Sequence, residues 1–403
     1  MPNFQNIRKK RVMKKIIVQL GFVLAFVVTF NQTNVYGQIE NESINTIVTA
    51  VPFLRIAPDA RAGSMGDAGI ATSTDANAMH FNASKLAFAE NDISVSATYT
   101  PWLRALDLQD VYLAYLSGYK QIDKISTVGL SLRYFSLGNI QFTDFNGSSL
   151  GSSRPNEFEI AGAYARQLSD NFALGVSLKF IYSRLANGTY NGFNIRPGIA
   201  AGADISATYK TDKGIFGQEG NQLTIGGAIT NLGTKITYTT DAFGEFIPTN
   251  LGVGVAYEHA IDDYNSIVLA VDINKLLVPT PDTLDIDNNR ILDHKEAGVA
   301  TAVFSSFSDA PGGFGEEFSE LSYSVGLEYW YDKQFAVRAG YFHEDPTKGN
   351  RKYFTVGLGL KYNIFGLNFS YLVPTSNRTN PLDNTLRFSL VFDFGALPAG
   401  TTK

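Results

Sequence analysis

The sequence contains no cysteine and comparatively little charge. The absence of cysteine excludes a disulfide scaffold, a thiolate nucleophile and a cysteine-ligated zinc site, and it excludes a lipid anchor on a mature N-terminal cysteine. Charged residues make up 18% of the 403 residues, below the roughly 25% that soluble domains usually carry. The net charge is −5, so the composition indicates no nucleic-acid partner.

Long apolar runs are also missing beyond the N-terminus. Residues 16–30, IIVQLGFVLAFVVTF, form the one long run, and about 15 residues fall short of the roughly 20 that a spanning helix needs. The basic stretch RKKRVMKK precedes this run, and a short polar stretch ending near Gly37 follows it. This order predicts a cleaved secretory signal over residues 1–37 in preference to a membrane anchor.

What the chain does have is many aromatic residues and glycines, with 29 Phe, 20 Tyr and 37 Gly. In the stretch NFALGVSLKFIYS, large apolar residues such as Phe172 and Leu178 alternate with small or polar ones such as Ser177 and Lys179. A period of two predicts a β-strand, because successive side chains point to opposite faces. Segments of this kind recur at residues 92–100, 109–118, 125–137, 156–167, 171–184, 197–210, 221–231, 249–259, 264–276, 320–331, 334–343, 353–363, 365–373 and 384–394.

The connections between these segments alternate in length. Even-numbered connections are mostly short, as at 168–170 and 332–333, whereas odd-numbered ones are longer, as at 138–155 and 277–319. Outer-membrane barrels join their strands in this way, with short periplasmic turns and long surface loops. We therefore predict an all-β fold, a 14-stranded antiparallel transmembrane β-barrel over residues 92–394 with its loops at the cell surface, followed by a tail, 395–403. A secreted β-sandwich is the alternative, but it has no reason to alternate short and long connections.

The polar face of these strands carries isolated charges of both signs. They are Arg133, Glu159, Lys179, Asp204, Glu258, Asp272, Glu328, Arg338, Lys361, Arg387 and Asp393. Because Arg or Lys on the lipid face costs about 2–4 kcal/mol at mid-depth, we expect these side chains to point into the barrel. They could line a selective aqueous pore or form paired charges that fill the interior, and the balance of signs favours pairing.

The segment before the first strand, residues 38–91, is rich in Ala, Gly, Ser and Asp and lacks alternation. Its stretch PDARAGSMGDAGIATSTDANAMHFNASKLAF resembles the N-terminal segment of the PorV family of the type IX secretion system, which is related to the FadL long-chain fatty-acid transporter. The family usually has Asn-Pro-Ala after an aromatic, whereas this chain has Phe81-Asn82-Ala83. The resemblance implies a FadL-like barrel with a small helical hatch inside the lumen. The residues that carry it are Asp59, Arg61, Gly63, Met65, Gly66, Asp67 and Asn82.

The resemblance also implies a function that is not enzymatic. PorV-like proteins are thought to bind cargo bearing a C-terminal signal domain at the translocon, a large outer-membrane barrel. They pass the cargo to a surface complex that contains a sortase-like protease. The alternative is a FadL-like channel for long-chain fatty acids or other hydrophobic small molecules, and a purely structural barrel is a third possibility. The charged and small inward positions speak against a channel for hydrophobic molecules, while the long loop 277–319 and the aromatic-rich loop 232–248 suit a protein-binding surface.

One stretch of the longest loop has the spacing of a calcium site. Oxygen-bearing side chains stand at positions 1, 3, 5, 9 and 12 of an EF-hand pattern: Asp285, Asp287, Asn289, Asp293 and Glu296. Position 6 holds Arg290 where the pattern has glycine, so a solvated acidic loop is the alternative. We predict no other cofactor and no catalytic residue, because the four histidines show neither metal spacing nor a recognisable catalytic partner.

Overall fold

The computed structural model describes residues 44–104, 108–143, 145–186, 188–190, 193–211, 221–239, 244–282, 292–374 and 385–396. The chain divides into two units between Ser43 and Ile44, and the described residues belong to the second unit. The predicted signal, residues 1–37, therefore lies outside the described part. Among the described residues, no helix combines the length and apolar character needed to span a membrane.

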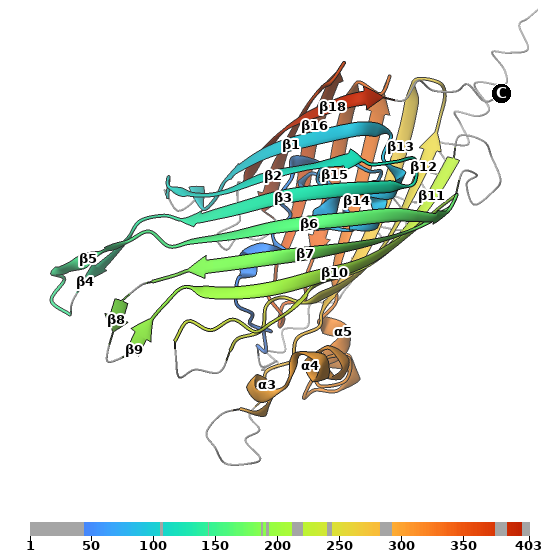
Figure 1. Cartoon of the computed structure of the whole chain (residues 1–403). Helices are drawn as coiled ribbons and strands as arrows, with labels where there is room; N and C mark the ends of the chain where they lie inside the picture. The colour runs from blue at the N-terminus through green and yellow to red at the C-terminus, as the bar shows by residue number, and fades with distance from the viewer. Residues whose placement is uncertain are drawn as a thin grey trace, which may run out of the picture. The chain divides into compact units, whose positions relative to one another are not determined.

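Fourteen strands of the described chain close into one antiparallel barrel (Figure 1). They are β1 (Asn91–Pro101), β2 (Val111–Gln121), β3 (Ser126–Leu137), β6 (Asn156–Ser169), β7 (Phe172–Arg184), β10 (Gly198–Thr211), β11 (Asn221–Gly233), β12 (Asn250–Ala260), β13 (Asn265–Leu276), β14 (Ser322–Tyr331), β15 (Phe335–His343), β16 (Lys352–Tyr362), β17 (Phe365–Pro374) and β18 (Leu386–Ala396). Each barrel strand pairs with the barrel strands that precede and follow it along the chain, and β1 closes the ring against β18. All fourteen predicted strands are confirmed.

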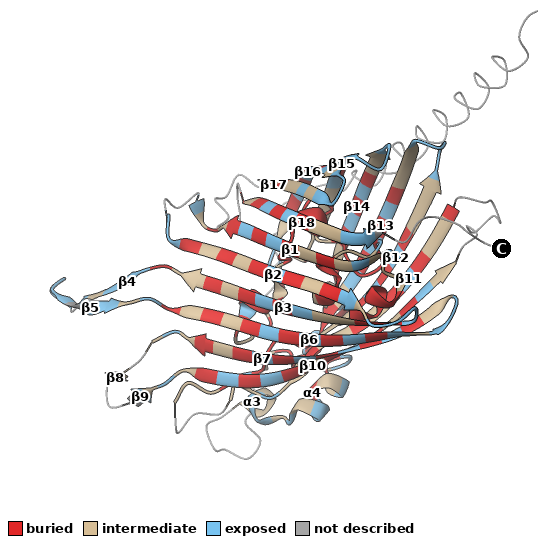
Figure 2. Cartoon of the chain, turned by 45° about the horizontal axis from the view of Figure 1, so that its top comes forward, coloured by how far each residue is buried: buried red, intermediate tan, exposed pale blue. Residues whose placement is uncertain are grey.

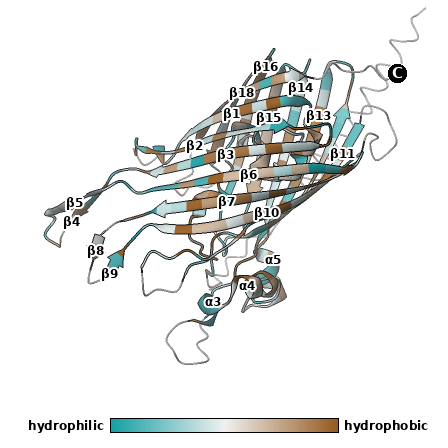
Figure 3. Cartoon of the chain, viewed as in Figure 1, coloured by the Kyte–Doolittle hydropathy of each residue, from teal (hydrophilic) through white to brown (hydrophobic). Residues whose placement is uncertain are grey.

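The two faces of the wall differ as the alternation predicted (Figures 2 and 3). In β7, Leu178 is 73% exposed, whereas the neighbouring Ser177 and Lys179 are 2% and 8% exposed. Figure 2 shows the same banding of exposed and buried residues along β10. Large apolar side chains exposed on the outside of a closed barrel are typical of a wall that faces lipid, and closure leaves no strand edge without backbone partners.

Short turns gather at one end of the barrel, which we call the turn end. The turns of β14–β15 and β16–β17 take left-handed backbone at Asp332, Lys333 and Asn363, with φ of 52°, 52° and 53°. Such residues make the tight turns that match the twist of paired strands. The opposite, loop end carries additional elements: β4 (Ile140–Thr143), β5 (Ser149–Ser153), β8 (Gly188–Tyr190), β9 (Phe193–Ile195), α3 (Asp293–Glu296), α4 (Val299–Ser305) and α5 (Phe314–Ser319).

The charges inside the wall are paired. Lys179 Nζ lies 2.9 Å from an Asp204 carboxylate oxygen and 3.7 Å from one of Glu159, and Arg133 Nε lies 3.5 Å from the other oxygen of Glu159. These four residues are all less than 10% exposed. Pairing neutralises groups that would be costly to bury singly. The prediction of paired interior charges is therefore confirmed for this part of the wall.

The N-terminal segment, residues 44–90, packs against the inner face of the wall. It contains η1 (Pro52–Arg55), α2 (Ala60–Gly63), η2 (Ala78–His80) and η3 (Ala83–Phe88). Its buried Met79 and Leu86 share an apolar cluster with alanines of β6 and β7. Small residues of the wall make room for it, since a Cβ at Gly340 would collide with the backbone of Met65 and Gly66.

Candidate functional site

The first candidate region is the stretch of the N-terminal segment that carries the family resemblance. Asp59 precedes α2, and its Oδ2 accepts a hydrogen bond from the backbone N–H of Ala62 at 2.9 Å. A carboxylate in this N-cap position satisfies a backbone donor that the helix leaves free. The short helix is thereby fixed, and it sets the direction of Arg61.

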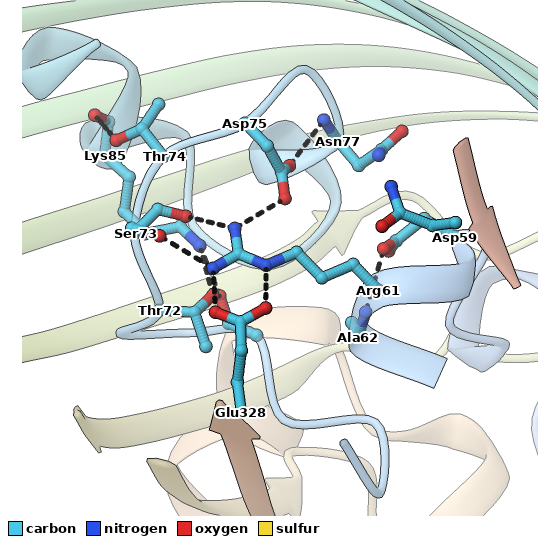
Figure 4. Close-up of polar contacts among 12 residues, drawn as sticks. Asp59, Arg61, Ala62, Thr72, Ser73, Thr74, Asp75, Asn77, Lys85 and Glu328 are labelled. Carbon is cyan, nitrogen blue, oxygen red and sulfur yellow. Dashed lines mark hydrogen bonds and ion pairs between the residues drawn. The ribbon is translucent and has the colours of Figure 1, made fainter. Parts of the chain in front are cut away.

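Arg61 joins the N-terminal segment to the wall (Figure 4). Its Nε and Nη2 donate to the two carboxylate oxygens of Glu328 at 3.0 and 2.8 Å, and its Nη1 donates to Asp75 at 3.0 Å. Glu328 lies on β14, is fully buried and also accepts from Arg338 of β15 at 2.6 Å. A bidentate arginine–carboxylate pair is strong and directional, so it fixes both the position and the orientation of this segment.

Four further residues of the resemblance contact inward-facing positions of the wall. Gly63 O accepts from Arg387 Nη1 at 3.4 Å, Met65 packs at Gly326, Gly66 N donates to Thr355 Oγ1 at 2.8 Å, and Asp67 Oδ2 accepts from the Tyr353 hydroxyl at 2.6 Å. Gly66 has a φ of 66°, and a Cβ there would lie 2.5 Å from the backbone oxygen of Tyr341. The chain reverses tightly against β15 at this point, which explains why glycine stands there.

Asn82 holds the turn in which the family has a proline and this chain does not. Its Oδ1 accepts from Ser84 N at 3.1 Å, and its Nδ2 donates to Ile70 O at 3.0 Å and to Thr208 Oγ1 at 2.9 Å. Ala83 occupies the first position of η3, where proline is favoured but not required. The side chain of Asn82 supplies the cap, so the turn forms without the proline.

The second candidate region is the platform, which we define as residues 277–282 and 292–321 between β13 and β14. Buried ion pairs fasten it to the barrel rim. Lys275 Nζ lies 2.9 Å from Glu317 and 2.6 Å from Glu320, and Lys348 Nζ lies 2.6 Å from Glu316 and 3.0 Å from Glu320. Burial alone would raise the pKa of Glu316, but the hydrogen bond from Lys348 holds this pKa below its ordinary value. Glu316 is therefore charged and paired at neutral pH.

Above this anchor, the platform exposes a set of aromatic side chains. Phe304 of α4 and Phe314 of α5 are 79% and 84% exposed, and Phe307 and Phe318 are 49% and 60% exposed. Phe314 and Phe318 stand four residues apart and share one face of α5. Exposed apolar side chains gathered in one region mark an interaction surface.

The prediction for the loop 232–248 was wrong at the aromatic residues that the structure describes. Phe246 is 9% exposed and packs beneath the platform with Leu276, Val278 and Ala302. The Tyr238 hydroxyl donates to Ser183 Oγ at 2.9 Å and so turns toward the wall. A loop aromatic that covers a core has the same sequence appearance as one that protrudes.

The calcium prediction stays a prediction. Asp285, Asp287 and Asn289 lie outside the described residues, while Asp293 and Glu296 begin and end α3. Within the described part of the chain, no group of three or more acidic, histidine or cysteine side chains is arranged to hold a metal ion.

Comparison with known proteins agrees with the resemblance. Residues 39–283, well over half of the chain, match the family described as "Type IX secretion system protein PorV". No curated protein matches the chain.

The chain is also similar to solved structures of transporters. The P. putida toluene transporter TodX is 12% identical, with a TM-score of 0.48 over 84% of this chain and 99% of that one. The CymD monoaromatic hydrocarbon channel is 12% identical, with a TM-score of 0.49 over 84% and 98%, and a Pseudomonas aeruginosa FadL homologue is 11% identical, with a TM-score of 0.42 over 87% and 100%. At these values the likeness carries no conclusion about what this chain transports. The family match alone is decisive: the chain belongs to the PorV family of type IX secretion system proteins.

Proposed function

We propose that this protein binds secreted cargo through the platform at its loop end and delivers the cargo to the cell-surface attachment complex. Membership of the PorV family supports this proposal, because it points to an outer-membrane component of the type IX secretion system with a role in transport. The proposed partners are cargo proteins with a C-terminal signal domain, the large translocon barrel and the sortase-like surface protease. The loop end would then lie at the cell surface, because barrels place their short turns in the periplasm.

The observation that carries this proposal is the exposure of four phenylalanines on a firmly anchored platform. Aromatic side chains supply much of the binding energy of protein interfaces when a partner removes them from water. The buried pairs of Lys275 and Lys348 hold α5 in place before any partner arrives. Less ordering is then required on binding, so more of the apolar contact contributes to affinity.

We further propose that the N-terminal segment serves as the hatch and that cargo does not pass through this barrel. A wider opening of about 780 Å³ lies beside Ala87 and Ala89 at the turn end, but the cavity between the segment and the wall nearer the loop end measures about 100 Å³. A volume of this size holds several water molecules, at about 10–15 Å³ each, and no polypeptide. The passage of cargo would accordingly belong to the translocon barrel, with this protein as its receptor.

A pull-down from detergent extracts tests the proposal. The double variant Phe304→Ala/Phe314→Ala should recover cargo at least tenfold less well than the parent, since burying each phenylalanine is worth roughly 1.5–3 kcal/mol. The matched control is Phe145→Ala in the β4–β5 hairpin, a fully exposed phenylalanine at the same end of the barrel, which should leave recovery unchanged. Equal recovery by both variants would refute a role for the platform. Recovery of a bound lipid with no protein partner would favour a channel for hydrophobic molecules.

A further inference from the structure

The N-terminal segment runs the whole length of the barrel. At its beginning, Asn45 N donates to Thr347 O at 3.1 Å, in the β15–β16 connection of the loop end. At its far end, Gln121 Nε2 at the turn end of β2 donates to Ala89 O at 2.6 Å, just before β1 begins. Residues 44–56 therefore lie at the loop end, beside the platform.

Residues 44–56 cover a polar chamber of about 100 Å³. Leu54 and Arg55 of these residues line it, and Asp67, Ile70 and His80 of the rest of the segment line it as well. Inward-facing residues of the wall complete the lining. Those wall residues are Thr230 and Ala228 on β11, Asn250 and Gly252 on β12, Asp272 and Asn274 on β13, and Ser322 and Ser324 on β14. A Cβ at Gly252 would lie 2.7 Å from Asn274 Oδ1, so glycine keeps this space open.

The chamber has the chemistry of a space that holds water or small polar solutes. Asp272 is 1% exposed, and its Oδ2 accepts from the backbone N–H groups of Gly69 and Ile70 at 2.7 and 2.9 Å. Its Oδ1 accepts no hydrogen bond from the described residues. Buried carboxylate oxygens are almost always hydrogen-bonded, so this oxygen points to a solvent molecule or solute in the chamber.

We propose that residues 44–56 form a lid, which opens the chamber at the loop end while residues 57–90 stay fixed to the wall. The lid closes through its own apolar side chains, because Val51, Phe53 and Leu54 are buried in a cluster with Trp102 and Phe135. Its polar contacts reach both the wall and the surface connections. The backbone carbonyls of Phe53 and Leu54 each accept from Arg133 Nη1 of β3 at 3.1 Å. Asn45 Nδ2 donates to Pro281 O at 3.2 Å and to Glu316 Oε1 at 3.0 Å.

The charged partners of the lid keep other partners when it leaves. Arg133 gives up the carbonyls of the lid but retains Glu159 at 3.5 Å and His80 Nδ1 at 2.5 Å. Glu344 accepts from Nε and Nη2 of Arg351 at 2.8 Å each, whereas Arg55 of the lid reaches the same carboxylate at 3.3 Å. Glu316 likewise keeps Lys348 at 2.6 Å when Asn45 departs. Opening therefore strands no buried carboxylate, and stranded charges are what make such separations costly. In contrast, withdrawing Gly69 and Ile70 would leave Asp272 without the donors that hold its Oδ2.

Two local features oppose the closed position. Val51 of the lid immediately precedes η1, with φ 47° and ψ 51°, and a β-branched residue is strained in left-handed backbone. Burial, together with the neighbouring guanidinium of Arg351, lowers the pKa of Arg55 to about 10. Opening the lid relieves both.

Thiol labelling of the purified barrel tests the lid, because the natural chain has no cysteine to interfere. Ser324 is 1% exposed and lines the chamber, so Ser324→Cys reports entry of a small cationic methanethiosulfonate reagent. We expect labelling at least tenfold faster when Asn45→Ala and Arg55→Ala are added. We expect it at least tenfold slower when Asn45→Cys and Thr347→Cys are joined by a disulfide, with reversal on reduction.

Two controls separate lid movement from loss of folding. Asp263→Cys, in the exposed β12–β13 turn, should label at one rate in every lid variant. Val48→Ala removes an exposed side chain of the lid and should leave the Ser324→Cys rate unchanged. Equal labelling of Ser324→Cys in the weakened, natural and locked lids would overturn the proposal. The measurement uses the barrel alone, so its result is independent of cargo binding.

Discussion

The N-terminal segment and the platform are both fastened to the barrel by buried ion pairs, yet they present opposite surfaces. Arg61 and Glu328 hold a segment whose side chains are almost entirely buried against the wall. Lys275 and Glu320 hold helices whose phenylalanines face outward. The comparison teaches that a buried charge pair can hold a segment against the inner face of the wall in one place and support an exposed surface in the other. The predictions below separate these two uses.

The largest effect is expected where the N-terminal segment meets the wall. Arg61→Ala leaves Glu328 buried with Arg338 alone and removes the partner of Asp75, and breaking a buried pair typically costs about 3–5 kcal/mol. We expect a clear drop in the urea midpoint for loss of heat-modifiable migration on gels. The urea midpoint of Arg61→Lys should lie between those of the parent and of Arg61→Ala, because lysine keeps the charge and loses the bidentate geometry. An unchanged midpoint for Arg61→Ala would show that this pair does not hold the segment.

A smaller effect is expected at the platform anchor. Lys275→Ala leaves Glu317 without its lysine, while Glu320 keeps Lys348 at 3.0 Å. We expect limited proteolysis to cut within residues 277–321 several times faster, with the migration of the barrel unaltered. Lys295→Ala is the matched control, since its pair with Glu245 is nearly half exposed and such pairs are worth about 0–1 kcal/mol. Equal cutting of both variants would argue against the anchor.

A pH effect should sharpen the contrast between the lid and the rest of the segment. Although burial favours the neutral acid, the hydrogen bonds from Arg351 lower the pKa of Glu344 below its ordinary value of 4.5. The charge of Arg55 on the lid adds to this lowering, and only this part is lost on opening, because Arg351 stays paired with Glu344. The contact of Arg55 with the charged carboxylate therefore stabilises the closed lid above pH 4.5, and this contribution is lost as the pH falls through the lowered pKa. We expect the fluorescence of Trp102, read in a Trp330→Phe background, to shift to longer wavelength at low pH. Glu344→Gln should remove the pH dependence of the Trp102 fluorescence. If the shift at low pH persists in Glu344→Gln, a group other than Glu344 causes it.

The smallest effect concerns the calcium prediction for residues 285–296. Because Arg290 replaces the glycine of the pattern, we expect weak binding, with a Kd on the order of 10⁻³ M, as in extracellular modules. Terbium luminescence should saturate in the natural chain and fall in Asp285→Asn/Glu296→Gln. Identical luminescence from the two proteins would favour the solvated acidic loop.

The strands could be predicted because alternation is a local property, visible in stretches such as Phe172 to Tyr182. The pairing of Arg61 with Glu328 could not, since the partners lie 267 positions apart and only barrel closure brings them together. The platform helices span four to seven residues, too few for a helical period to stand out. Whether an aromatic of a loop is buried like Phe246 or exposed like Phe314 depends on the fold around it. The left-handed backbone of Val51 has no sequence signal at all.

Photo-cross-linking in intact cells tests the central claim, that the platform receives cargo, most directly. A photoreactive phenylalanine analogue at Phe314 should yield an adduct with a protein that carries a C-terminal signal domain, and the same analogue at Phe145 should yield none. Adducts at Phe145 alone, or at neither position while cargo is being secreted, would contradict the account.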